Sequence, residues 1–345
     1  MIRYQISLFN LLLFSILYSC EISSNKDKKD IDYTQDAIQI ENKGSAQGTT
    51  YNIKYLAVDN LEDKIDSILL EIDNCFSLWS DSSLISRVNR GESIKFNNMF
   101  SDVFFASKEV YYETGGMFDC TIGPLVNAWG FGSYDSRSSL YLDSHIVSSL
   151  LEDIGFSKLE FNEESFTIPK DMMIDLNAIA QGYSVDLIAN FLLSNNINNF
   201  FIEIGGEIRC SGYREDNRSW TVGIDKPLPE IDHDDRFALI TPLINKSLAT
   251  SGNYRNFYIQ DGVKYSHTIN PITGYPAMNS LLSVSVLHNS CMYADAYATA
   301  FMAMGLYETK LFLRDRPDLD VYLIYSDNES NWQTYSSDGF KESSN

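Results

Sequence analysis

Residues 281–305 read LLSVSVLHNSCMYADAYATAFMAMG, and this stretch joins the two kinds of element that define the fold. Its first part, 281–287, is a short apolar run rich in Leu and Val, which predicts a buried strand. From residue 291 onward, small and apolar residues with good helix propensity predict a helix. A largely apolar strand followed directly by a largely apolar helix indicates a sheet with helices packed on it.

The rest of the chain alternates the same two elements, without internal repeats or low-complexity segments. Further strands are predicted at 49–58, 172–176, 200–204, 220–225, 237–241, 264–269 and 321–325, the last of which closes the sheet. Helices are predicted at 61–76, from a Ser101 cap to Gly115, at 143–155, and from the end of 172–176 to Ser194. We therefore expect an α+β fold of mostly antiparallel sheets flanked by helices, in one two-lobed domain over 44–340.

The chain is strongly acidic, with a formal net charge of −21 over 345 residues and a sequence pI of about 4.5. Such a surface repels phosphate backbones, which argues against nucleic acid as a partner. A phosphate-bearing ligand would need local neutralisation, and a divalent cation supplies it economically.

The first twenty residues, MIRYQISLFNLLLFSILYSC, have the pattern of a secretion signal, and their apolar run is too short for a convincing membrane span. The ending resembles a bacterial lipoprotein cleavage box. We expect 1–19 to be a signal peptide, Cys20 to be lipidated, and 20–43 to include a flexible tether. A plain signal peptide or an unprocessed anchor is the alternative. The protein is thus expected on the periplasmic side of a bacterial membrane, with inner or outer membrane left open.

Four further cysteines, Cys75, Cys120, Cys210 and Cys291, are widely spaced in the sequence. None belongs to a CxxC pair, so the spacing indicates neither a zinc site nor a dense disulfide framework. Individual disulfide pairs are left open by the sequence.

The predicted helix at 291–305 contains one acid, Asp295, and one hydroxyl, Thr299. They are four residues apart, so they lie on one helix face with Cβ atoms about 5–6 Å apart. Two oxygen ligands of one magnesium ion lie about 3 Å apart, which these side chains can reach. The alternative is that Asp295 caps a helix and Thr299 packs in the core. The surrounding alanines favour a cation, because a carboxylate in an apolar stripe is costly unless paired or bound to metal.

Three other features carry candidate site residues. The segment 175–183 predicts a helix start whose N–H groups could face an anion, although most such turns are structural. His267 lies in a polar, turn-rich segment and has an ordinary pKa near 6.5, which suits a general acid or base. Its alternative role is a histidine satisfied by backbone hydrogen bonds. Aromatic residues at Trp79 and within 118–132 could stack on a flavin or purine ring, although core aromatics are commoner.

These segments occur in an order that resembles the ApbE family, the FAD:protein FMN transferases, over about residues 44–310. The matching segments are QGTTY (47–51), FSLWSDSSLISRVN (76–89), FDCTIGPLVNAWGFG (118–132), DLNAIAQGYSVD (175–186), IEIGGEI (202–208), ATSGNYRNF (249–257), SHTINPITGYP (266–276) and ADAYATA (294–300). Eight collinear segments argue against a chance resemblance.

The resemblance implies a cleft for FAD, a magnesium ion that bridges protein and pyrophosphate, and transfer of FMN to a threonine or serine hydroxyl with release of AMP. It places magnesium on Asp295, Thr299 and the backbone oxygen of Ala180. It makes His267 the proton-handling residue and Asp295 the second catalytic residue. It places FAD against Gln47, Trp79, Asp119, Cys120, Thr121, Asn177, Tyr183 and Ile269. The chain departs from the family at Gln181 and Asn177, where lysine and a small residue or serine are frequent, which affects the contacts to FAD.

The acceptor implied by the resemblance is a periplasm-facing flavoprotein, expected to be a subunit of a membrane redox pump. A second enzymatic hypothesis is an FAD pyrophosphatase, in which water replaces the acceptor hydroxyl and the products are free FMN and AMP. A third is an FAD-binding lipoprotein without chemistry. The presence of Asp295, Thr299 and His267 argues against the third hypothesis.

Overall fold

The computed structural model describes residues 37–95, 97–132, 142–161, 166–228, 235–253, 257–260, 263–329 and 331–340. Residues Asp36–Asn345 form one compact unit. The predicted signal peptide and the predicted lipidation site Cys20 lie outside the described residues. In the part of the chain that is described, we find no helix with the length and apolar character needed to cross a membrane.

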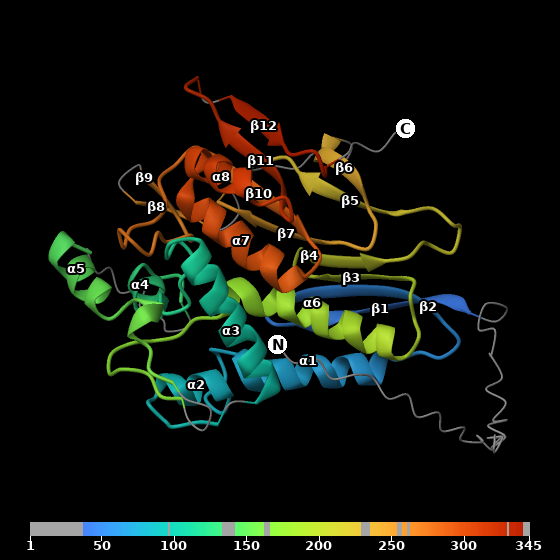
Figure 1. Ribbon diagram of the computed structural model, residues 1–345, viewed down its shortest axis with the longest axis horizontal. Helices are drawn as coiled ribbons and strands as arrows, with labels where there is room; N and C mark the ends of the chain where they lie inside the picture. The colour runs from blue at the N-terminus through green and yellow to red at the C-terminus, as the bar shows by residue number, and fades with distance from the viewer. Residues whose placement is uncertain are drawn as a thin grey trace, which may run out of the picture. The chain divides into compact units, whose positions relative to one another are not determined.

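Strands and helices occur in separate runs along the unit, as in an α+β protein, and not in the alternation expected from the sequence (Figure 1). The strands are β1 (Ile38–Ala46), β2 (Thr49–Ala57), β3 (Phe200–Ile204), β4 (Glu207–Ser211), β5 (Trp220–Asp225), β6 (Phe237–Leu243), β7 (Ser247–Gly252), β8 (Phe257–Gln260), β9 (Val263–Ser266), β10 (Leu281–His288), β11 (Asp320–Ser326) and β12 (Trp332–Ser336). The helices are α1 (Glu62–Phe76), α2 (Leu84–Asn89), α3 (Asn98–Glu113), α4 (Gly123–Ala128), α5 (Ser144–Glu152), α6 (Asn177–Ser194), α7 (Cys291–Met304) and α8 (Leu306–Phe312), with short 3₁₀ helices at Phe156–Lys158 and Leu313–Asp315.

The main sheet has eight strands in the order β1-β2-β3-β4-β7-β10-β11-β12. Each neighbouring pair in it is antiparallel. The hairpins β5–β6 and β8–β9 form two further antiparallel pairs. The predicted fold class, α+β with mostly antiparallel sheets flanked by helices, is therefore confirmed.

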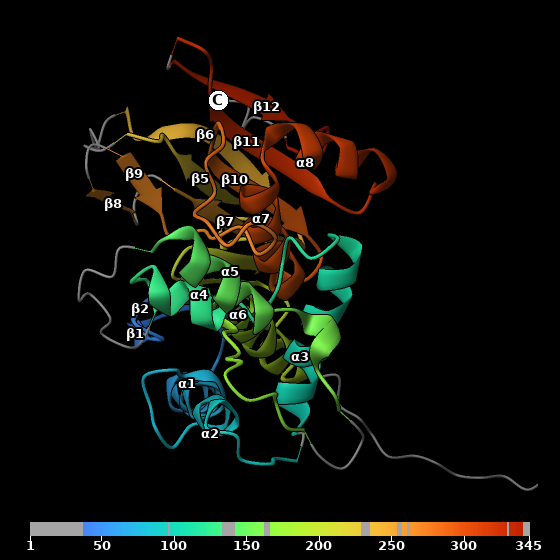
Figure 2. The ribbon, with the colours of Figure 1, turned by 90° about the vertical axis from the view of Figure 1, so that its left-hand side faces the viewer.

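Alternate side chains of the main sheet serve two different cores. On β11, Val321 and Leu323 join the core that contains α7, whereas Tyr322 and Ile324 join the core that contains β5 and β6. Helices α6 and α7 pack against one another and against the sheet (Figures 1 and 2). A fully buried aliphatic side chain contributes about 1.5–3 kcal/mol. The first core, which includes Ile179 of α6 and Ala298 of α7, therefore holds the start of α6 and the middle of α7 together.

Several predicted elements match the structure closely. The strands expected at 200–204 and 220–225 are β3 and β5, and the amphipathic helix expected at 61–76 is α1. Helix α5 begins after Asp143, whose carboxylate accepts hydrogen bonds from two backbone N–H groups of the first turn. Helix α6 ends at Ser194, as its pattern indicates.

The predicted strand at 172–176 is wrong. Only Met173 forms an isolated bridge, with Ile122, before α6 begins. The side chain of Asn89 donates to the carbonyl of Ile174 at 2.9 Å and accepts from its N–H at 2.8 Å. A side chain therefore satisfies the backbone groups that would otherwise pair with a neighbouring strand.

The predicted ends of two other elements also differ from the structure. Helix α3 is capped by Asn97, whose side chain accepts a hydrogen bond from the N–H of Phe100, and Ser101 lies inside its first turn. The strand expected at 264–269 ends at Ser266, and Ile269 forms only an isolated bridge with Pro276. His267 therefore lies in a turn rather than in a strand.

Both edge strands of the main sheet were missed by the sequence interpretation. Strand β1 pairs with β2 along its whole length, so the folded domain begins before residue 44 and includes the end of the segment expected as a tether. Strand β12 lies outside β11, so the 321–325 strand does not close the sheet. Edge strands expose one face and carry polar side chains, which makes their sequences resemble loops.

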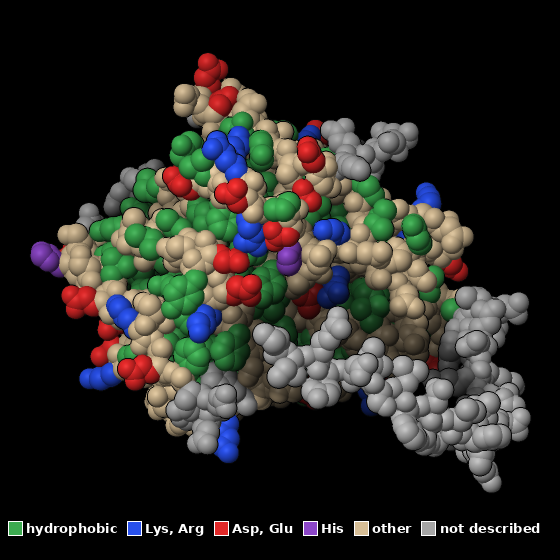
Figure 3. All heavy atoms as spheres, in the orientation of Figure 1, with side chains coloured by type: hydrophobic (Ala, Val, Ile, Leu, Met, Phe, Trp, Pro, Cys, Tyr) green, Lys and Arg blue, Asp and Glu red, His purple; other side chains and the backbone are tan. Residues whose placement is uncertain are grey.

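The surface and the cysteines agree with a folded acidic protein. Acidic and basic side chains are mixed on the face that carries α3, α7 and α8 (Figure 3).

The four described cysteines are free and buried, in different parts of the fold. Burial raises the pKa of the Cys75 thiol to about 11, so this thiol is neutral at physiological pH.

Candidate active site

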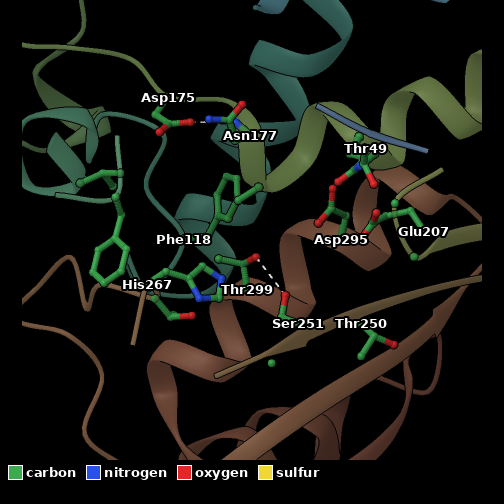
Figure 4. Close-up of a pocket in the computed structure, with 18 of the residues that line it drawn as sticks. Thr49, Phe118, Asp175, Asn177, Glu207, Thr250, Ser251, His267, Asp295 and Thr299 are labelled. Atoms are coloured by element: carbon green, nitrogen blue, oxygen red, sulfur yellow. Dashed lines mark hydrogen bonds between the residues drawn. The ribbon is translucent and has the colours of Figure 1, made fainter. Parts of the chain in front are cut away.

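A pocket of about 1160 Å³ lies where the start of α6, the middle of α7 and the strands β4 and β7 meet. It is lined by seven of the predicted site residues, namely Asp119, Cys120, Asn177, His267, Ile269, Asp295 and Thr299. Figure 4 shows several of them around the same space. Small-molecule sites usually measure about 300–1,000 Å³, so this pocket has room for a large ligand such as a dinucleotide.

Asp295 is held by a close contact between α6 and α7. Its Oδ2 atom accepts a hydrogen bond of 3.1 Å from the backbone N–H of Gly182. Its side chain is 6% exposed, and this burial raises its pKa to about 7, while the Gly182 bond opposes the shift. The carboxylate is thus fixed by a backbone donor in an environment that disfavours its charge.

Helix packing allows this contact only because residue 182 is a glycine. A Cβ atom at Gly182 would lie 2.4 Å from the carbonyl oxygen of Cys291 and 2.9 Å from the Cβ of Asp295. Such distances require the helices to separate. The glycine therefore sets the spacing that brings Asp295 to the pocket.

A second buried acid, Glu207, also lines the pocket. It is the first residue of β4, and its side chain lies beside that of Asp295 (Figure 4). Burial, followed by repulsion from Asp295, raises the pKa of Glu207 well above its usual value. Its Oε2 atom has no hydrogen-bond partner.

Thr299 lies one helical turn after Asp295, as the sequence predicts. Its hydroxyl lies 3.3 Å from the hydroxyl of Ser251 on β7, and either oxygen could donate. Both side chains line the pocket. The predicted Asp295–Thr299 pair is therefore on one wall, next to a second hydroxyl that the sequence interpretation did not include.

The backbone oxygen of Ala180, predicted as a metal ligand, lies inside α6 and is not part of the pocket lining formed by the described residues. It accepts a hydrogen bond of 2.8 Å from the hydroxyl of Ser184. That hydroxyl in turn accepts a bond of 2.6 Å from the side-chain amide of Gln47. Gln47 therefore contacts the helix that carries the predicted ligand and does not line the pocket.

His267 follows β9 and reaches the pocket from a tight turn. The turn is closed by backbone bonds from Ala277 to Thr268 at 2.8 Å and from Asn270 to Tyr275 at 2.8 Å. The His267 ring packs edge-on to Phe131, with ring centroids 6.4 Å apart. The turn thus fixes the backbone after His267, and the pairing of β9 with β8 fixes the backbone before it.

The loop before α4 contributes a buried carboxylate that is almost fully satisfied. Asp119 accepts bonds from the N–H and the hydroxyl of Thr121, at 2.9 and 2.7 Å, and from the N–H of Phe156 at 3.3 Å. Burial raises its pKa and these bonds oppose the shift. Thr121 is fully buried, so it shapes the loop while Asp119 and Cys120 line the pocket.

Two predicted aromatic contacts are not brought to this pocket. Trp79 is 69% exposed on the turn after α1 and is not part of the pocket lining. Tyr183 packs edge-on to Phe76, and its hydroxyl donates to Asp102 at 2.9 Å beside a separate, smaller pocket of about 480 Å³. Asn177, by contrast, lies at the start of α6 and lines the large pocket.

We expect Gly182→Ala to destabilise the protein by about 1–3 kcal/mol, because the new methyl group overpacks the α6–α7 contact. Urea unfolding measures the loss as a lower transition midpoint with an unchanged slope. Ser194→Thr adds a methyl group at the exposed end of the same helix and is expected to change stability by less than about 0.5 kcal/mol. Equal midpoints for the two variants would contradict the packing described for Gly182.

Sequence comparison places this arrangement among known proteins. The model of the ApbE family matches residues 47–323. A curated FAD:protein FMN transferase of Vibrio cholerae is 36% identical over 315 residues, which cover 88% of this chain and 92% of that protein. The FAD:protein FMN transferase of Haemophilus influenzae is 31% identical, and the match covers 87% of this chain and 90% of that protein.

Comparison with solved structures also finds ApbE flavin transferases. The flavin transferase ApbE from Vibrio cholerae superposes with a TM-score of 0.78 at 34% identity and covers 88% of this chain and 98% of that chain. The apo form of the flavinyl transferase ApbE from Pseudomonas stutzeri superposes with a TM-score of 0.78 at 26% identity. The match covers 88% of this chain and 95% of that chain. Because the match spans most of the folded unit and nearly the whole length of these relatives, this chain belongs to the ApbE family.

Proposed function

We propose that this protein transfers FMN from FAD to a hydroxyl group of a target flavoprotein and releases AMP. The observation that carries the proposal is a single pocket in which Asp295, Thr299 and His267 meet. Relatives named FAD:protein FMN transferase match the chain across this pocket. They support FAD as the substrate and a transferase activity.

The residues of the pocket fit a magnesium ion. Mg²⁺ prefers carboxylate, hydroxyl and carbonyl oxygens. Asp295 and Thr299 offer two such oxygens, whereas the backbone oxygen of Ala180 lies outside the pocket lining and stays a prediction as a third ligand. Burial and Asp295 raise the pKa of Glu207, whose buried Oε2 atom has no hydrogen-bond partner, and a cation beside the two acids would favour their charged forms. A bound Mg²⁺ would offset the charge on the phosphate oxygens.

The chain's own residues perform the remaining tasks of the proposed reaction. A bond forms between the acceptor hydroxyl oxygen and the phosphorus of FMN, and the bond from that phosphorus to AMP breaks. The hydroxyl proton passes to His267, and AMP leaves with the electron pair of the broken bond. The backbone N–H of Gly182 holds Asp295 in place during this exchange.

The pH dependence of stability offers a test of the Asp295 environment. Its pKa of about 7 in the metal-free folded protein exceeds the unfolded value near 3.9. The folded protein therefore keeps a proton that the unfolded chain loses, so this group's contribution to stability falls as pH rises from about 4 to about 7. We expect Mg²⁺ to oppose this fall, since the cation binds the deprotonated carboxylate.

Thermal melts between pH 4 and 8, with and without Mg²⁺, measure this effect. The Mg²⁺-induced rise in Tm is expected to be small near pH 5 and larger at pH 8. A rise in Tm that does not depend on pH would contradict the role of Asp295. The same melts on Asp295→Asn serve as the control, since the variant lacks the titrating group.

We further propose that the protein works at the periplasmic side of a bacterial membrane, held by a lipid on Cys20. The acceptor would then be a periplasm-facing flavoprotein, such as a subunit of a membrane redox pump. Globomycin treatment of cells, or Cys20→Ser, is expected to leave the precursor unprocessed or to release the protein from membranes. Unchanged processing and membrane association would contradict the anchor.

Incubation with FAD, Mg²⁺ and a purified candidate acceptor separates the proposal from its closest alternative. Transfer predicts fluorescent flavin on the acceptor in a denaturing gel. A pyrophosphatase predicts free FMN and AMP with an unlabelled acceptor. Binding of FAD with no AMP under any divalent metal would indicate a non-catalytic flavin-binding protein.

A further inference from the structure

Glu207 is a buried acid that no basic side chain of the described part of the chain neutralises. Its side chain is 7% exposed, and its Oε2 atom lacks a hydrogen-bond partner. Within the described ranges, no Lys, Arg or His pairs with it. A buried, unpaired carboxylate of this kind costs several kcal/mol unless another charge compensates it.

The basic residue on the same strand, Arg209, forms an ion pair with another acid. Glu207 lies opposite Ile204 in the β3–β4 register, and Arg209 is two residues farther along the same face of β4. Arg209 donates to Asp186 at 2.5 Å in a largely buried ion pair. Its charge is therefore neutralised by Asp186 and does not serve Glu207.

The neighbour of Glu207 in the pocket makes its position less favourable. Asp295 is an acid of similar burial, and it lies beside Glu207 in the pocket (Figure 4). Each acid could stay neutral by holding a proton, but the Oε2 atom of Glu207 has no hydrogen-bond partner to receive or donate one. A cation beside the two acids would let both keep their charge and would give Oε2 a partner.

We propose that Glu207 is a ligand of the divalent cation that Asp295 and Thr299 hold. The inference rests on the proposed function for the identity of the physiological cation as Mg²⁺. Two carboxylates together neutralise a dication, so the cation binds the free protein before FAD arrives. With Asp295 as the sole carboxylate, the pyrophosphate of FAD would have to supply the rest of the negative charge.

Titration of the metal-free protein with Mn²⁺ in the absence of FAD tests this assignment. Mn²⁺ takes the same oxygen ligands as Mg²⁺, and electron paramagnetic resonance reports its free concentration. We expect the wild-type protein to bind Mn²⁺ without FAD and Glu207→Gln to bind it about 10- to 100-fold more weakly. Mg²⁺ is expected to raise the Tm of the wild-type protein more than that of the variant.

Glu71→Gln is the matched control. Glu71 is exposed on α1 and does not line the pocket. Its replacement is expected to change the Kd for Mn²⁺ by less than about twofold. Glu207→Asp, which keeps the charge but withdraws it by one methylene group, is expected to give an intermediate loss.

A folded Glu207→Gln protein that binds Mn²⁺ like the wild type would overturn the assignment. If the variants do not fold, infrared spectra of the wild-type protein with ¹³C-labelled glutamate can show whether a glutamate carboxylate binds the cation. Addition of Mg²⁺ is expected to shift a ¹³C-glutamate carboxylate band, and shifts in aspartate bands alone would overturn the inference. A third outcome separates the two proposals. If Glu207→Gln binds Mn²⁺ more weakly but the wild-type protein does not transfer FMN to any acceptor, the proposed function is wrong and the assignment of Glu207 as a cation ligand stands.

Discussion

Asp295→Asn is expected to lower the Mg²⁺-dependent turnover of FAD by at least about 10³-fold while the protein stays folded. The amide has nearly the same volume as the carboxylate and can still accept the bond from Gly182. It lacks the negative charge that a cation requires. The loss of rate therefore reports the charge at this position rather than the α6–α7 packing.

AMP release at saturating FAD and Mg²⁺ measures this loss, and the Tm of the metal-free variant checks its fold. Because the variant removes a charge that burial disfavours, its metal-free Tm is expected to equal or exceed that of the wild type above pH 7. Asp63→Asn, an exposed acid in the first turn of α1, is the control and is expected to retain full activity. Full Mg²⁺-dependent activity in Asp295→Asn would remove Asp295 from the cation site.

His267→Gln is expected to lower the rate of transfer by about 10²- to 10⁴-fold, the usual contribution of a general base. The decrease is expected in kcat, with little change in the affinity for FAD. It should also flatten the acid side of the pH–rate profile, since the group that must lose its proton is gone. Fluorescence quenching of FAD gives the affinity, and AMP release gives the rate.

His145→Gln is the matched control for this prediction. His145 is exposed in the first turn of α5 and does not line the pocket. Its replacement is expected to leave both the rate and the pH profile unchanged. An acid limb that persists in His267→Gln would assign the base to another group.

The sequence predicts those parts of the fold whose patterns are local. The i, i+4 spacing places Asp295 and Thr299 on one face of α7, and the structure brings both to the pocket. The alternation in 200–204 predicts β3 without error. Both signals depend on neighbouring residues and not on distant contacts.

The errors occur where distant residues decide the local structure. At residues 172–176, the apolar pattern is that of a strand, but the side chain of Asn89 occupies the backbone groups of Ile174. No local pattern reveals a partner that lies 85 residues away. The edge strand β1 was missed for the opposite reason, because its exposed face makes a paired strand look polar.

Glu207 shows which signal in the sequence could have extended the site. It lies within IEIGGEI, a segment that was noted only for its resemblance to the family. Its register opposite Ile204 places an acid on the buried face of a strand. An acid at an inward position of an alternating strand is costly, and this cost indicates a functional role.

The position of Trp79 shows the limit of transferring residue roles by resemblance. The structure places this ring in an exposed turn, away from the pocket that holds Asp295. A contact between Trp79 and FAD thus stays a prediction, which quenching of the tryptophan fluorescence by FAD in the wild type and in Trp79→Phe can test.

The most direct test of FMN transfer is the ratio of covalent flavin to AMP. The protein is incubated with FAD, Mg²⁺ and a candidate acceptor, and intact-mass spectrometry counts FMN groups on the acceptor while chromatography measures AMP. The account predicts one AMP for each FMN bound to the acceptor and neither product with Asp295→Asn. AMP matched by free FMN, with an unmodified acceptor for every flavoprotein tried, would contradict it.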